Sequence, residues 1–234
     1  MPSLEQARAW YDPHDPVHGF DHVLRVLELA ERLGRELGAD LEVLRAAALL
    51  HDAAGAAPAG VGGGGAKADH EAAEPVGAEA GHQAAGRATH ELDSAAFARS
   101  VLGAEGWPAE RIEAVAHCIR AHRFRGAESP STREAQVLFD ADKLDVLGAF
   151  GVARTLGYAL QAGQPFFAEP SAGFLETGAL EPGEPHSAYH EYMFKLRQVS
   201  GRLHTEPARR LAERRHAVMR AFFEQLAAEA HGDV

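Results

Sequence analysis

Apolar residues recur with the period of an α-helix, about 3.6 residues, along nearly the whole chain. One such series runs through Phe20, Val23, Leu24, Leu27 and Ala30. Patterns of this kind, together with capping boxes, predict helices near residues 3–11, 17–38, 40–52, 92–103, 108–122, 132–147, 148–161, 187–200 and 205–229. No convincing segment alternates with the two-residue period of a strand. The pattern therefore predicts an all-α fold.

Residues 53–88 interrupt the helical pattern. The stretch begins AAGAAPAGVGGGGAKAD, and between positions 51 and 91 Val61 and Val76 are the only large apolar side chains. Such a composition cannot bury enough surface to offset the entropy lost on ordering. We expect a flexible loop, either a neutral insertion or a lid, because long loops that leave directly from a site are often functional.

The domain organisation follows from length and composition. A chain of 234 residues can form one large domain or two small ones, and the sequence shows no internal repeat and no clean boundary. We expect a single helical bundle over residues 1–234 that carries the flexible Gly/Ala-rich insertion. Within it, residues 187–231 are expected to supply C-terminal helices that pack on the core.

Charge and cysteine content exclude several classes of protein. The chain has 23 Lys and Arg against 34 Asp and Glu, a net charge of −11, so no basic surface for duplex nucleic acid is expected. The single cysteine, Cys118, excludes an intrachain disulfide and is typical of a reducing compartment. No segment resembles a secretion signal or a membrane span. We expect a cytoplasmic protein that does not contact a membrane.

The chain contains 14 histidines, and two of them form a pair on one predicted helix. His18 and His22 lie four residues apart, so both rings project from the same face. This spacing can hold a metal ion, or a metal ion and a phosphate, although such pairs also occur without a ligand. The zinc-protease pattern needs glutamate after the first histidine. Position 19 is glycine, which excludes that class.

Two further groups of ionisable residues lie in apolar surroundings. His51 and Asp52 end the run LRAAALLHD, and burying an unpaired carboxylate there would be costly. Asp140, Asp142 and Asp145 lie within VLFDADKLDVLGAFG. Each group fits either a helix that faces a polar cleft or a helix surface that faces water.

The order of these groups, His, then His-Asp, then Asp, resembles the HD-domain superfamily of metal-dependent phosphohydrolases. The resemblance rests on HGFDHVLRV (18–26), AALLHD (47–52), EAVAHCIRAHRF (113–124) and LFDADKLDVLGAFGVAR (138–154). The segment 190–226, which begins HEYMFKL, is similar to the tail of a subfamily of small, stand-alone bacterial HD hydrolases. Together these segments cover most of the chain outside 53–88.

The resemblance implies roles for individual residues. The metal ligands are expected to be His22, His51, Asp52 and Asp142, with Asp52 also orienting the attacking water and His18 near the substrate phosphate or that water. Relatives with two metals add histidines between the His-Asp doublet, here His51 and Asp52, and the last aspartate. The candidates for such a site, or for binding phosphate, are His90, His117 and His122. His117 and His122 are five residues apart, about 140° around a helix, so we expect His122 rather than His117 to face the cleft. Cationic or substrate-binding candidates are Arg25, Lys143, Arg154, His190, Lys195 and Arg209.

The resemblance implies a hydrolase that uses one divalent ion, or two, drawn from Mn²⁺, Mg²⁺, Fe²⁺ or Zn²⁺. The expected reaction is pyrophosphate release from (deoxy)nucleoside triphosphates, by a monomer or homodimer. The alternatives are a 5′-nucleotidase or triphosphohydrolase, a phosphodiesterase of cyclic or linear dinucleotides, and a ligand-sensing helical module without activity. The sequence after the doublet, HDAAGA, lacks the acidic residues of alarmone hydrolases, which argues against guanosine tetraphosphate as substrate.

Overall fold

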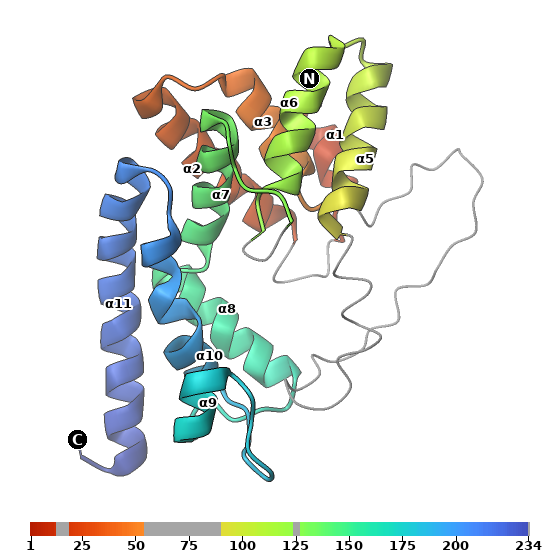
Figure 1. Cartoon of the computed structure of the whole chain (residues 1–234). Helices are drawn as coiled ribbons and strands as arrows, with labels where there is room; N and C mark the ends of the chain where they lie inside the picture. The colour runs from red at the N-terminus through yellow and green to blue at the C-terminus, as the bar shows by residue number, and fades with distance from the viewer. Residues whose placement is uncertain (13–18, 54–89, 124–126, 234) are drawn as a thin grey trace, which may run out of the picture. The chain divides into compact units, whose positions relative to one another are not determined.

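The computed structural model describes residues 1–12, 19–53, 90–123 and 127–233, and all the regular structure in them is helical (Figure 1). The all-α prediction is therefore confirmed. His18 and residues 54–88 of the expected insertion lie outside the described residues. The helices are α1 (Leu4–Arg8), α2 (Phe20–Leu37), α3 (Leu41–Leu50), α5 (His90–Ala104), α6 (Ala109–Arg120), α7 (Arg133–Asp145), α8 (Gly148–Gln161), α9 (Ala172–Thr177), α10 (Ala188–Phe194) and α11 (Glu206–His231), with a 3₁₀ helix, η1 (Leu196–Arg202).

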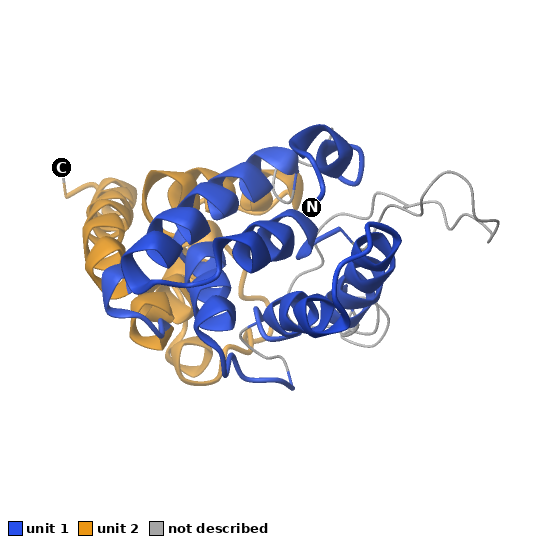
Figure 2. Ribbon diagram, turned by 90° about the horizontal axis from the view of Figure 1, so that it is seen from above, with its two compact units in different colours: residues 1–63, 83–145, 203–208 blue, residues 64–82, 146–202, 209–234 orange. Residues whose placement is uncertain are grey.

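These helices fall into two compact units (Figure 2). The first holds α1 to α7 and residues 203–208, and the second holds residues 146–202 and the chain from Arg209 onward. The expected single domain stays a prediction. No helix in the described parts of the chain is both long and apolar enough to cross a membrane.

Helix α3 is the centre of the first unit. It contacts α1, α2, α5, α6 and α7, and an unbroken run of its residues, Ala46 to Leu50, is buried. Helix α2 approaches it at Gly34, where an added Cβ would lie 2.5 Å from Leu44 Cδ1. Because α3 is surrounded by other helices, the residues at its end, His51 and Asp52, reach the interior of the unit.

The turn between α2 and α3 has well-defined caps. Gly38 ends α2 in the left-handed conformation, with φ of 66°, which glycine adopts without strain. Asp40 then begins α3, because its carboxylate accepts hydrogen bonds from the backbone N–H groups of Glu42 and Val43. The same carboxylate accepts two hydrogen bonds from Arg111 of α6. The cap therefore fixes both the start of α3 and its contact with α6.

Asp40→Ala is expected to lower the free energy of unfolding by about 1 kcal/mol, since two N–H groups at the start of α3 lose their acceptor. Urea denaturation followed by circular dichroism measures this loss. Asp40→Asn is the matched control, because asparagine caps helices about as well as aspartate. If the asparagine variant loses as much stability as the alanine variant, the charge opposite Arg111 is responsible rather than the cap.

The second unit has an aromatic core between α10 and α11. Tyr192 stacks on Phe223 with ring centroids 4.4 Å apart and an interplanar angle of 11°. One helix predicted from the sequence, 187–200, is wrong in detail: α10 ends at Phe194 and a 3₁₀ helix follows. The backbone N–H of Gln198 donates to the carbonyl of Lys195, three residues earlier, as a 3₁₀ turn requires.

Candidate metal centre

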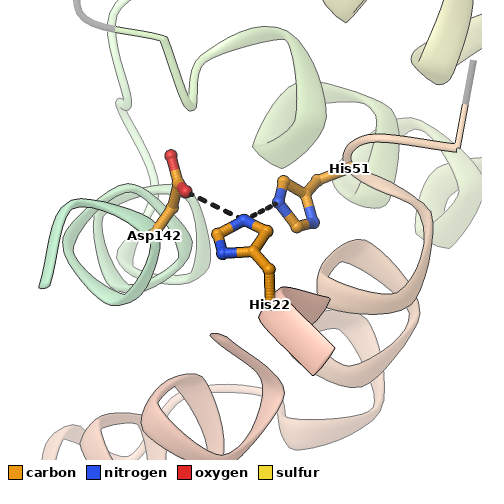
Figure 3. A group of neighbouring side chains, drawn as sticks. All are labelled: His22, His51 and Asp142. Atoms are coloured by element: carbon orange, nitrogen blue, oxygen red, sulfur yellow. Dashed lines mark hydrogen bonds and ion pairs between the residues drawn. The ribbon is translucent and has the colours of Figure 1, made fainter. Parts of the chain in front are cut away.

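Three helices of the first unit bring His22, His51 and Asp142 together (Figure 3). His22 lies in the first turn of α2, His51 follows the last residue of α3, and Asp142 lies near the end of α7. The Nε2 atom of His22 is 3.4 Å from His51 Nε2 and 3.4 Å from Asp142 Oδ1. All three side chains are buried. The cluster is therefore an interior site, built from segments that are far apart in the sequence.

Asp52 extends this cluster on its other side. Its Oδ2 atom lies 3.3 Å from His51 Nε2 and 3.9 Å from His22 Nε2. Its Oδ1 atom lies 3.2 Å from His90 Nε2 and 3.6 Å from His122 Nε2. The two oxygens of one carboxylate thus face two pairs of histidines.

Hydrogen bonds donated by the Nδ1–H groups orient three of these rings. His51 Nδ1–H donates to the carbonyl of Ala48 over 2.8 Å, and His122 Nδ1–H donates to the carbonyl of Ile119 over 2.6 Å. His22 Nδ1–H donates to Asp145 Oδ2 over 2.8 Å. Because carbonyl and carboxylate oxygens accept but do not donate, each neutral ring carries its hydrogen on Nδ1 and presents the Nε2 lone pair to the cluster.

This arrangement fits a cation. The lone pairs of His22 and His51 point toward each other over 3.4 Å, and carboxylate oxygens of Asp52 and Asp142 border the same space. Nitrogen and oxygen donors without a thiolate suit Mn²⁺, Fe²⁺, Zn²⁺ or Mg²⁺. His22, His51, Asp52 and Asp142 would hold such an ion.

The pKa values show how strongly the cluster attracts positive charge. Burial lowers the pKa of His51, but the carboxylates of Asp52 and Asp142 outweigh it and raise that pKa to about 9. Burial also opposes the charged form of His22, and Asp142 and Asp145 raise its pKa. Burial raises the pKa of Asp52, yet His51, His122 and His90 together hold it well below its usual value. Without a metal, the cluster would bind protons instead.

Neighbouring contacts hold His51 and Asp52, and also His90 and His122, in place. The hydroxyl of Tyr11, buried beside α1, donates to the carbonyl of Leu49 over 2.9 Å in the last turn of α3. Arg123 donates to Glu91 over 2.7 Å, which ties the start of α5 to the end of α6. The sequence carries no signal for these contacts, because each joins segments that only the fold brings together.

Of the remaining candidates in the first unit, one lies beside the cluster and another has contacts elsewhere. Lys143 forms an ion pair with Asp142 and lies over the ring of Phe139, so it is next to the cluster. His117, by contrast, contacts Glu128 and Ser131.

The other candidates have partners of their own. Arg25 forms two hydrogen bonds with Asp145. In the second unit, His190 is buried between Ser187 and Glu184, and Lys195 pairs with Glu191. For Arg154, His190, Lys195 and Arg209, contact with substrate stays a prediction.

The chain is similar to known proteins over most of its length. The HD domain family matches residues 19–147, which include all the histidines and aspartates of the cluster. The YpgQ protein of Bacillus subtilis (strain 168) is 28% identical over 240 aligned positions, covering 99% of this chain and 96% of YpgQ. The crystal structure of Bacillus subtilis YpgQ in complex with ADP has a TM-score of 0.65 at 26% identity, over 97% of both chains. A predicted HD superfamily hydrolase from an uncultured Thermotogales bacterium has a TM-score of 0.57 at 25% identity, over 97% of this chain and 90% of its own.

Proposed function

This chain belongs to the HD domain family, and from that premise we propose that it hydrolyses nucleoside triphosphates to a monophosphate and pyrophosphate. The observation that carries the proposal is that donor atoms of His22, His51 and Asp142 lie within 4.8 Å of one another in a buried site, with Asp52 Oδ2 3.3 Å from His51 Nε2. A divalent ion bound there would lower the pKa of a water molecule and stabilise charge on phosphoryl oxygens.

The residues of the chain supply the other parts of the reaction. Asp52 is partly exposed and, besides binding the ion, would orient the attacking water and accept its proton. Lys143, beside Asp142, would neutralise negative charge on the phosphates. The water would attack the α-phosphorus in line with the leaving pyrophosphate, as the bond from that phosphorus to the pyrophosphate oxygen breaks.

The choice of a nucleotide as substrate is supported by the similar protein YpgQ, which has been crystallised with ADP. A triphosphate substrate carries several negative charges, while the protein has a net charge of −11. Local cations must therefore overcome a general repulsion. The ion and Lys143 would do so next to the doublet, and we propose that Arg154, Lys195 or Arg209 contributes further charge.

A second ion, or a phosphate group, has a candidate position at His90 and His122. Both rings face Oδ1 of Asp52, at 3.2 Å and 3.6 Å, while Oδ2 of the same carboxylate faces His51 and His22. His90, His122 and Asp52 would hold this second group. Elemental analysis of the purified protein distinguishes one ion per chain from two.

Product analysis tests the proposed reaction. The protein is incubated with Mn²⁺ and a panel of nucleoside triphosphates in water enriched in ¹⁸O. The products are then separated and their masses are measured by mass spectrometry. We expect monophosphate and pyrophosphate, with the label showing which phosphorus the water attacked. His51→Ala and Asp52→Ala should give no product, and His231→Ala, which changes an exposed histidine of α11, serves as the control.

Other products would change the assignment. Inorganic phosphate or triphosphate would keep the site but place the cut at another bond. Hydrolysis of dinucleotides alone would identify a phosphodiesterase. A folded protein that binds nucleotides but hydrolyses none of them would be a ligand-sensing module.

A further inference from the structure

Asp145, the last residue of α7, is a buried carboxylate that meets α2 beside the metal centre. Its Oδ2 atom accepts a hydrogen bond from His22 Nδ1 at 2.8 Å. Arg25 donates to both of its oxygens, from Nε to Oδ1 at 2.7 Å and from Nη2 to Oδ2 at 3.0 Å. Since His22 and Arg25 are three residues apart on α2, both side chains face α7. Arg25 and His22 thus share one carboxylate.

This contact fixes the ring of His22. The carboxylate of Asp145 accepts hydrogen bonds and donates none, so the Nδ1 atom of His22 carries the hydrogen and Nε2 presents its lone pair to His51 and Asp142. A carboxylate behind a ligating imidazole also increases the basicity of the ligand, and such partners commonly determine metal affinity. Arg25 in turn binds both oxygens of the carboxylate, because two N–H groups of the planar guanidinium match their spacing.

Asp140 provides an internal comparison on the same helix. It is as buried as Asp145, but its carboxylate accepts hydrogen bonds from the backbone N–H groups of His204 and Thr205 and from the Thr205 hydroxyl. Those contacts join α7 to the start of α11. The two aspartates thus have the same helix and burial but different partners, and only Asp145 touches a residue of the metal centre.

We propose that Asp145 and Arg25 are positioning residues that set the metal affinity of the site through the ring of His22. The proposal rests on the proposed function, because it takes His22 as a ligand. In this proposal Arg25 acts on the metal centre through Asp145 and does not touch the metal ion. The sequence alone predicts instead that Arg25 contacts the substrate.

Direct measurement of Mn²⁺ binding, without nucleotide, tests this proposal. Free Mn²⁺ is followed by electron paramagnetic resonance during titration of the metal-free wild type and the variants. Asp145→Asn is expected to weaken Mn²⁺ binding by about 10- to 100-fold, because the amide nitrogen places a donor opposite Arg25 or His22. Arg25→Lys keeps the charge but loses the paired hydrogen bonds, and should weaken binding by a smaller factor.

Asp140→Asn is the matched control, since it makes the same substitution in the same helix at equal burial. It should lower the melting temperature while leaving the Mn²⁺ dissociation constant unchanged. If Asp145→Asn instead lowers only the melting temperature and binds Mn²⁺ within about twofold of wild type, Asp145 has a purely structural role and the proposal is wrong.

Two further outcomes separate this proposal from the proposed function. If wild type hydrolyses nucleotides and Asp145→Asn binds Mn²⁺ normally, the function stands and the positioning role fails. If wild type binds none of Mn²⁺, Fe²⁺, Zn²⁺ and Mg²⁺, both fail. Should Asp145→Asn not fold, Arg25→Lys decides the question, because its side chain is 24% exposed and tolerates substitution better; unchanged binding in that variant would overturn the proposal.

Discussion

Replacing His51 by alanine is expected to remove Mn²⁺ binding and to lower kcat/KM for the nucleoside triphosphate by about 1000-fold or more. The imidazole is fully buried, and its Nε2 atom faces His22 and Asp52 at 3.4 Å and 3.3 Å. A bound metal contributes several kcal/mol to catalysis, and each 1.36 kcal/mol corresponds to about a factor of ten in rate.

Asp52→Asn tests the same centre with less change in volume. The amide retains one oxygen but loses the negative charge that faces His51, His90 and His122, so we expect a loss of similar size. Steady-state kinetics with Mn²⁺ titrated in each reaction measures both variants, and circular dichroism shows whether they are folded. A folded His51→Ala protein that keeps more than about a tenth of the wild-type kcat/KM would show that hydrolysis occurs elsewhere.

Helix periodicity predicted much of the framework that holds this site. The apolar run before His51 predicts a buried helix, and α3 is indeed the most enclosed helix of the first unit. The resemblance to the HD-domain superfamily implied that His22, His51 and Asp142 would meet, and the structure brings them within 4.8 Å of one another. The buried helix follows from a pattern that is local in the sequence, whereas the set of ligands follows from the resemblance to a known family.

Pairings between distant helices could not be read from the sequence in the same way. Periodicity shows which residues share a face of a helix, but not which helix that face will meet. From the sequence alone, Arg25 is a cation that could bind substrate. In the structure its guanidinium contacts Asp145, 120 residues later in the chain. The spacing of Asp142 and Asp145, three residues apart, places both on the face of α7 that meets α2, and it was the available signal for this contact.

The fall in stability with pH that His51 causes in the metal-free protein is expected to flatten when metal is added. In the metal-free protein, His51 has a pKa of about 9 against an ordinary value of 6.5. A group whose pKa is raised by folding stabilises the folded state fully below its unfolded pKa, and this contribution is lost as the pH rises through its folded pKa. The free energy of unfolding should therefore fall between about pH 6.5 and pH 9, by about 3 kcal/mol from His51.

Mn²⁺ should act in the opposite direction, because it binds the deprotonated Nε2 atoms and protons compete with it at low pH. Since binding to the folded state raises stability, the increase in melting temperature at a fixed excess of Mn²⁺ should grow between about pH 6.5 and pH 9. Calorimetry with chelator or with Mn²⁺ at each pH measures both trends. His51→Gln keeps a polar side chain without a titrating ring and should remove most of each trend. An increase in melting temperature that is equal at both ends of this range would mean that Mn²⁺ does not displace protons from these histidines.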